Sequence, residues 1–346
     1  MARLYAATGD GIARLDESRG AWTAELFLPG SGAQCLAVAP DDPDTVYAGL
    51  REGGVRRTVD AGRSWLDCAL PEPGVFSLAV SAVDGAVYAG TEPSRLFRSD
   101  GRGESWRELD ALLELPSRPS WSFPPRPWTS HVRWIAPSPY DADLLLVGIE
   151  LGGLMRSTDG GATWQDHRPG AQPDVHSLAW HPRVPGHAYE AGGGGAAFST
   201  NGGETWQPAD EGRDRHYTWS VTVEPDGPDC WYLSASTGPY AAHGGRDPQA
   251  RIYRVATGNR GSRSPAGYRS RSRRRPTHSS PPRVVSSQAS PTGRSGKATM
   301  VGIAGRRCGS RVTRLAPSLH SSAQAADADA AVPPLPFGGR TSHVPR

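Results

Sequence analysis

Short apolar runs of four to six residues, separated by Gly, Pro and Asp, recur through residues 1–257. The runs come in pairs, such as 35–40 with 45–49 and 76–80 with 86–90, and a third short run follows each pair. Runs of this length, rich in Val and aromatic residues and bounded by turn residues, predict β-strands. We therefore expect the first three quarters of the chain to be all-β.

A short turn segment recurs after each set of strands. It occupies residues 58–65, 99–106, 157–164 and 199–206, with a worn copy at 16–22, and its tryptophans are 41, 58 and 42 residues apart. Its Asp or Asn side chain accepts hydrogen bonds from backbone N–H groups, and its Gly supplies the positive φ that a tight turn needs. We expect the Trp to pack between repeats. These structural roles fall to Asp60, Trp65, Trp106, Asp159, Trp164, Asn201 and Trp206.

Four strands in roughly 42 residues is the size of one propeller blade. Residues 1–30 resemble a first blade that lacks its inner strand, and four more blades follow at 31–73, 74–126, 127–172 and 173–211. A sixth begins at Trp219 and extends to Arg254. The predicted fold is therefore an all-β propeller of four-stranded blades, about six present and seven expected. A seventh blade would return the missing strand to the first.

The turn segments resemble the Asp-box (BNR) repeats of the sialidase-like and sortilin-like propellers, whose pattern is Ser-x-Asp-x-Gly-x-Thr-Trp. Residues 157–164 match it fully, whereas the second copy has Gly101 and the fourth Asn201 at the Asp position. The resemblance covers about residues 1–257. It implies a bacterial glycosyl-hydrolase-like protein in which the boxes are structural and lie away from the catalytic centre.

The last quarter of the chain has a different composition. Residues 258–346 contain 16 basic and 2 acidic residues, so they carry +14 and leave −11 for residues 1–257. All 11 tryptophans precede residue 232. Such an Arg-, Ser- and Pro-rich segment predicts a disordered tail. It could bind nucleic acid or another polyanion, or act as a localisation signal, but we favour the product of a shifted reading frame, because the blade pattern stops within a unit.

Candidate chemistry lies where the inner strands begin, at the axis of a propeller. Alignment of these strands places Gln34, Phe76, Arg133, His176 and Trp219 at one position of successive blades. Two residues earlier, on the same face, stand Gly32, Gly74, His131, Asp174 and Tyr217. A packing position would hold similar apolar residues in every blade, so this variation favours the lining of a binding site.

Other residues are expected near the same end of the ring. Glu190 is interpreted as standing where other blades carry Gly49, Gly90 and Gly148, and Glu150 follows the turn of its own blade. A Pro- and aromatic-rich insertion at residues 121–128 leads into the third inner strand and could form a wall for a ring-shaped ligand. The remaining candidates for binding are Arg215, His216, Tyr240 and His243.

Two function classes fit these residues. The family resemblance implies glycoside hydrolysis, with Glu190, Glu150, Asp174 and Tyr217 as candidate catalytic groups and His131, Arg133, His176 and Trp219 among the binding groups. The Arg-containing motif typical of sialidases near the start of the chain is absent, which counts against sialidase activity proper. The alternative is a non-catalytic propeller that binds a protein or peptide, as sortilin-like receptors and assembly factors do.

The remaining sequence features concern cofactors, metals and membranes. Four cysteines (Cys35, Cys68, Cys230 and Cys308) show no metal-binding spacing, so we assign neither metal ligands nor a cofactor. No signal peptide and no apolar run long enough for a membrane span is recognised, which favours a cytoplasmic protein with no membrane partner. Carbohydrate or peptide is the expected ligand, and nucleic acid is expected only if the basic tail is genuine.

Overall fold

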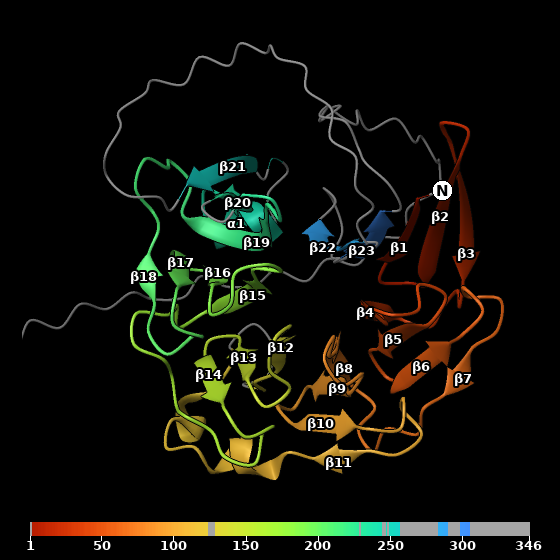
Figure 1. The fold of residues 1–346 in the computed structure, drawn as a ribbon, viewed down its shortest axis with the longest axis horizontal. Helices are drawn as coiled ribbons and strands as arrows, with labels where there is room; N and C mark the ends of the chain where they lie inside the picture. The colour runs from red at the N-terminus through yellow and green to blue at the C-terminus, as the bar shows by residue number, and fades with distance from the viewer. Residues whose placement is uncertain are drawn as a thin grey trace, which may run out of the picture. The chain divides into compact units, whose positions relative to one another are not determined.

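The computed structural model describes residues 2–123, 129–227, 230–243, 247, 249–256, 283–289 and 298–304. They belong to one compact unit that extends to Arg307, and residues 308–346 lie outside the described part. The described residues form six antiparallel sheets, so the predicted all-β propeller fold is confirmed. Figure 1 shows these sheets as successive blades around a common centre.

The first sheet has the strand order β22-β23-β1-β2-β3. The next three sheets follow the chain in order, and each begins with its innermost strand. Their bounds are β1 Arg3–Ala7, β2 Ile12–Ser18, β3 Ala21–Phe27; β4 Ala33–Val38, β5 Val46–Leu50, β6 Val55–Thr58, β7 Leu66–Asp67; β8 Val75–Val80, β9 Val87–Thr91, β10 Leu96–Ser99, β11 Arg107–Glu108; β12 Val132–Pro137, β13 Leu145–Ile149 and β14 Gly153–Ser157.

The fifth and sixth sheets continue the ring. Two short 3-10 helices, Asp110–Glu114 and Arg118–Ser120, lie in the long connection before β12, and α1 (Pro239–His243) follows β20. No helix among the described residues is long and apolar enough to cross a membrane. The remaining strands are β15 Val175–Trp180, β16 Ala188–Gly192, β17 Gly195–Ser199, β18 Gln207–Pro208; β19 Tyr217–Val223, β20 Cys230–Ser236, β21 Arg251–Ala256; β22 Arg283–Ala289 and β23 Ala298–Ala304.

The first blade receives its inner strands from the far end of the sequence. β23 pairs antiparallel with β1, Arg3 standing opposite Ile303, and β22 pairs with β23. β22 contacts β19 and β23 contacts β4, so these two strands stand between the sixth and second blades. The missing inner strand was expected from a seventh blade. It comes instead from within residues 258–346, the segment that the sequence assigned to the tail. The remaining tail residues lie outside the described part, so their disorder stays a prediction.

The four turn segments form the hydrogen-bonded corners that the sequence predicts. In the first, Asp60 accepts the Ser64 N–H at 2.9 Å, and the Thr58 hydroxyl accepts the Gly62 N–H at 2.9 Å. Residues 157–163 and 199–205 repeat this pattern, with Asp159 and Asn201 in the place of Asp60. The second corner, where Gly101 stands at the Asp position, keeps only the N–H of Gly103 bonded to the Ser99 hydroxyl.

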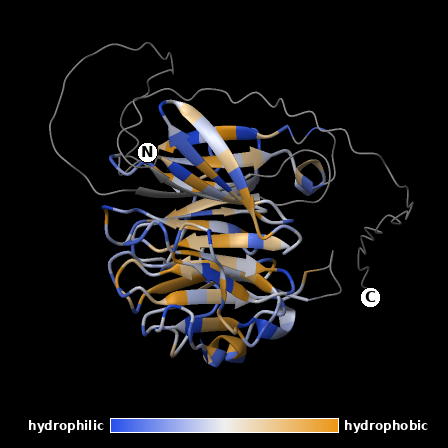
Figure 2. Ribbon diagram, turned by 90° about the vertical axis from the view of Figure 1, so that its right-hand side faces the viewer, coloured by the Kyte–Doolittle hydropathy of each residue, from blue (hydrophilic) through white to orange (hydrophobic). Residues whose placement is uncertain are grey.

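Each corner tryptophan packs where its own sheet meets the preceding one. Trp206 is 5% exposed and joins a core cluster built from the sheets of β12 and β15. The other three corner tryptophans join the corresponding clusters at the three earlier junctions. Figure 2 shows the stacked sheets from the side, with apolar residues in orange along their strands. The apolar seams between blades therefore form the core.

Glycine and valine set the distance between neighbouring blades. A Cβ on Gly49 would lie 2.6 Å from Cγ1 of Val75 in the next blade, and one on Gly148 would lie 2.4 Å from Cγ1 of Val175. Gly90 has the same relation to Val132 at 2.5 Å. β5, β9 and β13 thus carry a glycine because the valine that begins the next inner strand occupies the space.

Candidate functional site

A β-bulge lies near the start of five inner strands. In each strand one residue is skipped in the pairing with the second strand, as Arg133 is between Val132 and Trp134. A bulge leaves the extra residue unpaired and redirects its side chain. The skipped residues are the aligned set that the sequence selected: Gln34, Phe76, Arg133, His176 and Trp219. The framework therefore presents a different side chain at one place in each blade.

Glu150, which follows β13, is held by two basic side chains of its own blade. Its Oε2 lies 2.6 Å from Nε2 of His131 and 3.5 Å from Nε of Arg133, and all three side chains are buried. The Arg133 guanidinium lies 5.7 Å from the ring centroid of Phe76 and 5.2 Å from that of Trp219. Charges removed from water need partners of this kind. Together these contacts hold the Glu150 carboxylate at the blade end where the inner strands begin.

Asp174 and His176 form the facing pair in the next blade. Asp174 Oδ2 lies 3.4 Å from Nε2 of His176, whose Nδ1 lies 2.6 Å from the carbonyl oxygen of Thr218. A carbonyl only accepts, so Nδ1 carries the proton and donates it. Gly193 leaves room for the aspartate, because a Cβ there would lie 1.9 Å from its Oδ2.

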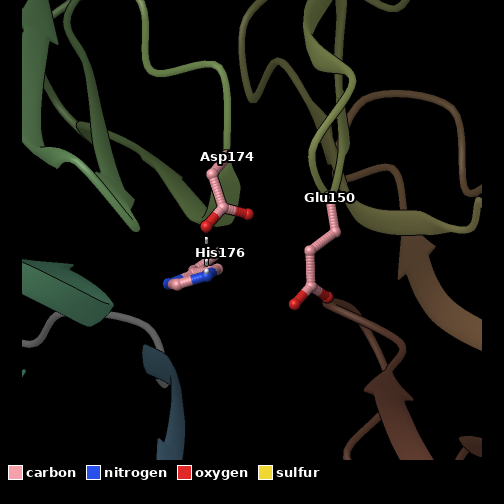
Figure 3. Close-up of side chains that lie close together, drawn as sticks. All are labelled: Glu150, Asp174 and His176. Carbon is pink, nitrogen blue, oxygen red and sulfur yellow. Dashed lines mark ion pairs between the residues drawn. The ribbon is translucent and has the colours of Figure 1, made fainter. Parts of the chain in front are cut away.

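These two groups converge. One donor atom from each of Glu150, Asp174 and His176 lies within 4.8 Å of the others. Figure 3 shows the Asp174 carboxylate beside the His176 ring, with the Glu150 carboxylate facing both from the preceding blade. The side chain of Asp174 is 18% exposed, whereas that of Glu150 is 2% exposed. The arrangement can bind a cation, share protons or present two carboxylates to one substrate bond.

Aromatic and imidazole rings of the sixth blade border this cluster. The Tyr217 hydroxyl lies 2.8 Å from Nε2 of His243, and the ring of His176 meets the edge of Tyr217 at 5.1 Å and tilts against Trp219 at 4.7 Å. Burial, followed by the charge of Asp174, raises the pKa of the Tyr217 hydroxyl well above its usual value. Tyr217 is therefore a neutral hydroxyl at physiological pH.

Glu190 does not stand where the sequence alignment placed it. Its pairing partner in β15 is Leu178, which matches the pairing of Ala48 with Leu36 in the second blade, whereas Ala191 takes the glycine position. Successive strand residues face opposite sides, so a shift by one residue reverses the side chain. The expectation that Glu190 replaces a glycine was wrong.

The actual surroundings of Glu190 are a seam between blades. The side chain is fully buried, and its Oε2 accepts the backbone N–H of Gln172 at 2.9 Å. Its cross-strand neighbours Leu178 and Ala197 belong to the apolar cluster between the fourth and fifth blades. Burial raises the pKa of the carboxyl to about 8. Glu190 therefore supports the segment that leads to Asp174 and is not a member of the cluster with Glu150.

Three other binding candidates either make other contacts or are exposed. Arg215 contacts Asp214 at 2.8 Å and the carbonyl of Gln249 at 3.4 Å. His216 is exposed and Tyr240 in α1 is 82% exposed. Within the insertion, Trp121 is buried and the Phe123 ring meets the edge of His131 at 5.1 Å, while residues 124–128 lie outside the described part.

Two residues of the site were not predicted from the sequence. Glu92 lies 3.4 Å from Nδ1 of His131 and follows its second strand at the same position as Glu150 does. Thr218 stands where three earlier inner strands have valine, and its hydroxyl bonds to Gly192 and Gly195. Alignment of the loops after the second strands would have found Glu92, and the change from Val to Thr was a readable signal.

Comparison with solved structures finds propeller folds. The GH74 xyloglucanase from Xanthomonas campestris aligns with TM-score 0.56 and 22% identity over 74% of this chain and 42% of that one. An ancestral GH74 enzyme gives 0.51 and 19% over 67% and 31%, and the extracellular domain of a hybrid two component system from B. thetaiotaomicron gives 0.50 and 16% over 67% and 30%. No family model and no curated protein matches.

These likenesses concern the fold. At identities below a quarter, shared architecture does not carry activity from one chain to another. The chain spans less than half the length of each of these three structures.

Proposed function

We propose that this chain is a carbohydrate-acting propeller of the Asp-box class, with its sugar site at the axial cluster and with Glu150 and Asp174 as the carboxylate pair of a glycoside hydrolase. The observation that carries the proposal is the approach of these two side chains, from neighbouring blades, to within 4.8 Å. The buried rings of Phe76, Tyr217 and Trp219 surround the cluster with aromatic side chains, which are common in sugar sites. The GH74 enzymes with the same fold give the carbohydrate class further support.

A closest approach of 4.8 Å or less between oxygens of the two carboxylates is compatible with hydrolysis with retention of configuration. Retaining enzymes keep their carboxyl groups about 5–5.5 Å apart, whereas inverting enzymes leave roughly 6.5–9.5 Å for a water molecule. Asp174 is the better nucleophile, because its side chain is partly exposed and its Oδ1 accepts no hydrogen bond from the described residues. Glu150 is hydrogen-bonded to His131 at 2.6 Å, and this pair is the candidate acid and base.

Hydrolysis would proceed in two steps in which atoms and protons are conserved. An Asp174 oxygen attacks the anomeric carbon, the bond to the leaving sugar breaks, and the leaving oxygen takes the proton held between His131 and Glu150. In the second step this pair takes a proton from water, and the resulting hydroxide releases the sugar from Asp174. Tyr217, another of the catalytic candidates, is less suitable as the nucleophile, because the raised pKa keeps its hydroxyl protonated. The candidates Glu190 and Arg215 have other contacts.

The proposal is tested on the full chain with 4-nitrophenyl glycosides of both anomeric configurations and with xyloglucan oligosaccharides. Asp174→Asn and Glu150→Gln should each lower kcat/KM by about a hundredfold or more while keeping measurable sugar binding. Asp41→Asn is the matched control, since Asp41 is exposed in the turn between β4 and β5. The anomer released first, followed by NMR, should have the configuration of the substrate.

Two results would count against the proposal. Sugar binding without turnover would favour a non-catalytic lectin-like role for the same site. Absence of both sugar binding and turnover, together with binding of a peptide, would favour the alternative of a sortilin-like or assembly-factor-like propeller.

A further inference from the structure

The axial cluster contains a nitrogen ligand that glycoside hydrolysis does not use. Glu150, Asp174 and His176 offer two oxygens and one nitrogen within 4.8 Å of one another. We propose that these three side chains form a binding site for a divalent transition-metal ion, with Zn²⁺ the best fit.

The His176 ring is held in one orientation. Its Nδ1 donates to the Thr218 carbonyl at 2.6 Å, so in the neutral ring the lone pair is on Nε2. Within the described part of the chain, this wholly buried Nε2 has no hydrogen-bond partner, although it faces Asp174 Oδ2 at 3.4 Å. A backbone carbonyl on the second ring nitrogen is the usual support of a metal-bound histidine. The ring is thus fixed with an unused donor atom aimed into the cluster.

The distances within the cluster are close to those of a tetrahedral zinc site. Bonds of 2.0–2.1 Å in a tetrahedral zinc site place neighbouring ligand atoms about 3.3 Å apart. Asp174 Oδ2 and His176 Nε2 already stand 3.4 Å apart. The Glu150 oxygen needs to approach by about 1.5 Å at most, which a carboxylate can do by rotation of its side chain. Three protein ligands would leave the fourth position open to water or to a ligand.

The ligand types select the ion. Calcium and magnesium take oxygen ligands, whereas an imidazole nitrogen with carboxylates suits Zn²⁺ or Mn²⁺. The two carboxylates balance the charge of the ion. Arg133, 3.5 Å from Glu150, opposes it, and Glu92 near His131 adds a negative charge on the same side. We therefore expect affinity in the micromolar range, weaker than that of a structural zinc site.

A bound ion would occupy both proposed catalytic carboxylates. Zn²⁺ should therefore inhibit the hydrolysis proposed above, and this consequence alone rests on the proposed function. Binding of the ion is measured without any substrate, so it can succeed where hydrolysis fails and fail where hydrolysis succeeds.

The test is calorimetric titration of the chelator-treated full chain with ZnCl₂. We expect one site in the wild type, lowered in affinity by at least about tenfold in His176→Gln and Asp174→Asn. His187→Gln is the matched control, because His187 lies in the turn between β15 and β16 and should leave the binding unchanged. CaCl₂ should give no comparable heat.

Cobalt gives a second measurement. Co²⁺ bound at this site should produce visible absorption bands that disappear in both site variants and persist in His187→Gln. Absence of Zn²⁺ binding in the wild type would overturn the proposal, and so would equal affinity in the wild type and a folded Asp174→Asn. Asp174 is partly exposed, so this variant keeps the test decisive if His176→Gln does not fold.

Discussion

The imidazole of His176 donates a 2.6 Å hydrogen bond to the backbone carbonyl of Thr218, across the junction of the fifth and sixth blades. At the three preceding junctions the residue equivalent to Thr218 is a valine that packs on a glycine. Here the glycine position is held by Ala191, and the threonine hydroxyl instead bonds to Gly192 and Gly195. The departure from the repeated packing therefore coincides with the site.

Replacement of Thr218 by valine restores the residue of the other blades and removes these hydrogen bonds. The buried N–H of Gly192 and carbonyl of Gly195 lose their partner, so we expect a loss of stability of about 1–3 kcal/mol. Urea unfolding followed by tryptophan fluorescence measures it. Thr222→Val on the same strand is the control and should change the midpoint little, because Thr222 is only partly buried. An unchanged midpoint for Thr218→Val would mean that the hydroxyl is not needed.

Gly148 tests the packing rule of the ordinary junctions. A Cβ at this position would lie 2.4 Å from Cγ1 of Val175, so Gly148→Ala should destabilise the chain by about 1–3 kcal/mol through overpacking. Gly101→Ala is the matched control, since the nearest atom to its Cβ would be 3.9 Å away. Thermal unfolding should show a lower midpoint for the first variant only. Equal midpoints would show that neighbouring blades can move apart to accommodate the added methyl group without loss of stability.

The buried Glu190 predicts a pH dependence. Its pKa rises to about 8 in the folded chain, because burial disfavours the charged form, against 4.5 as the ordinary value. Between these values the unfolded chain has lost the proton and the folded chain keeps it, so stability falls as pH rises from about 4.5 to 8 and then levels off. Glu190→Gln cannot ionise and keeps an acceptor for the Gln172 N–H.

The comparison between wild type and Glu190→Gln isolates this effect. The free energy of unfolding of the variant, relative to that of the wild type, should increase as pH increases. The difference should be on the order of a few kcal/mol at pH 8. Unfolding midpoints at pH 5, 6, 7 and 8 measure the difference. A constant offset across these pH values would contradict a raised pKa at this position.

The corners were readable in the sequence because their hydrogen bonds are local. Thr58, Asp60 and Gly62 bond within five residues, so spacing alone identifies the turn, and the strands follow from it. The bulged residues were also found, since their variation between blades stands out. Glu190 was misplaced because one residue of register decides which blade a side chain faces. Asp174 and Glu150 belong to different blades, so no local sequence pattern gives the distance between them.

Closure of the ring by β22 and β23 gives the last prediction. Without β23, the backbone groups of β1 that pair with it would form an open sheet edge, which is an aggregation hazard. A chain ending at residue 257 should therefore unfold at a lower temperature and aggregate sooner than the full chain. A chain ending at residue 307 keeps both strands and is the control; it should behave like the full chain.

Hydrogen exchange locates the cause of this effect. The amides of Arg3–Ala7 that pair with β23 should exchange slowly in the 307-residue chain and fast in the 257-residue chain, because only the first retains their partners. If both chains protect these amides equally and unfold at the same temperature, residues 283–304 do not close the ring. The prediction of a reading-frame shift near residue 257 would then regain its force, and the coding DNA in the neighbouring frames should restore a seventh blade.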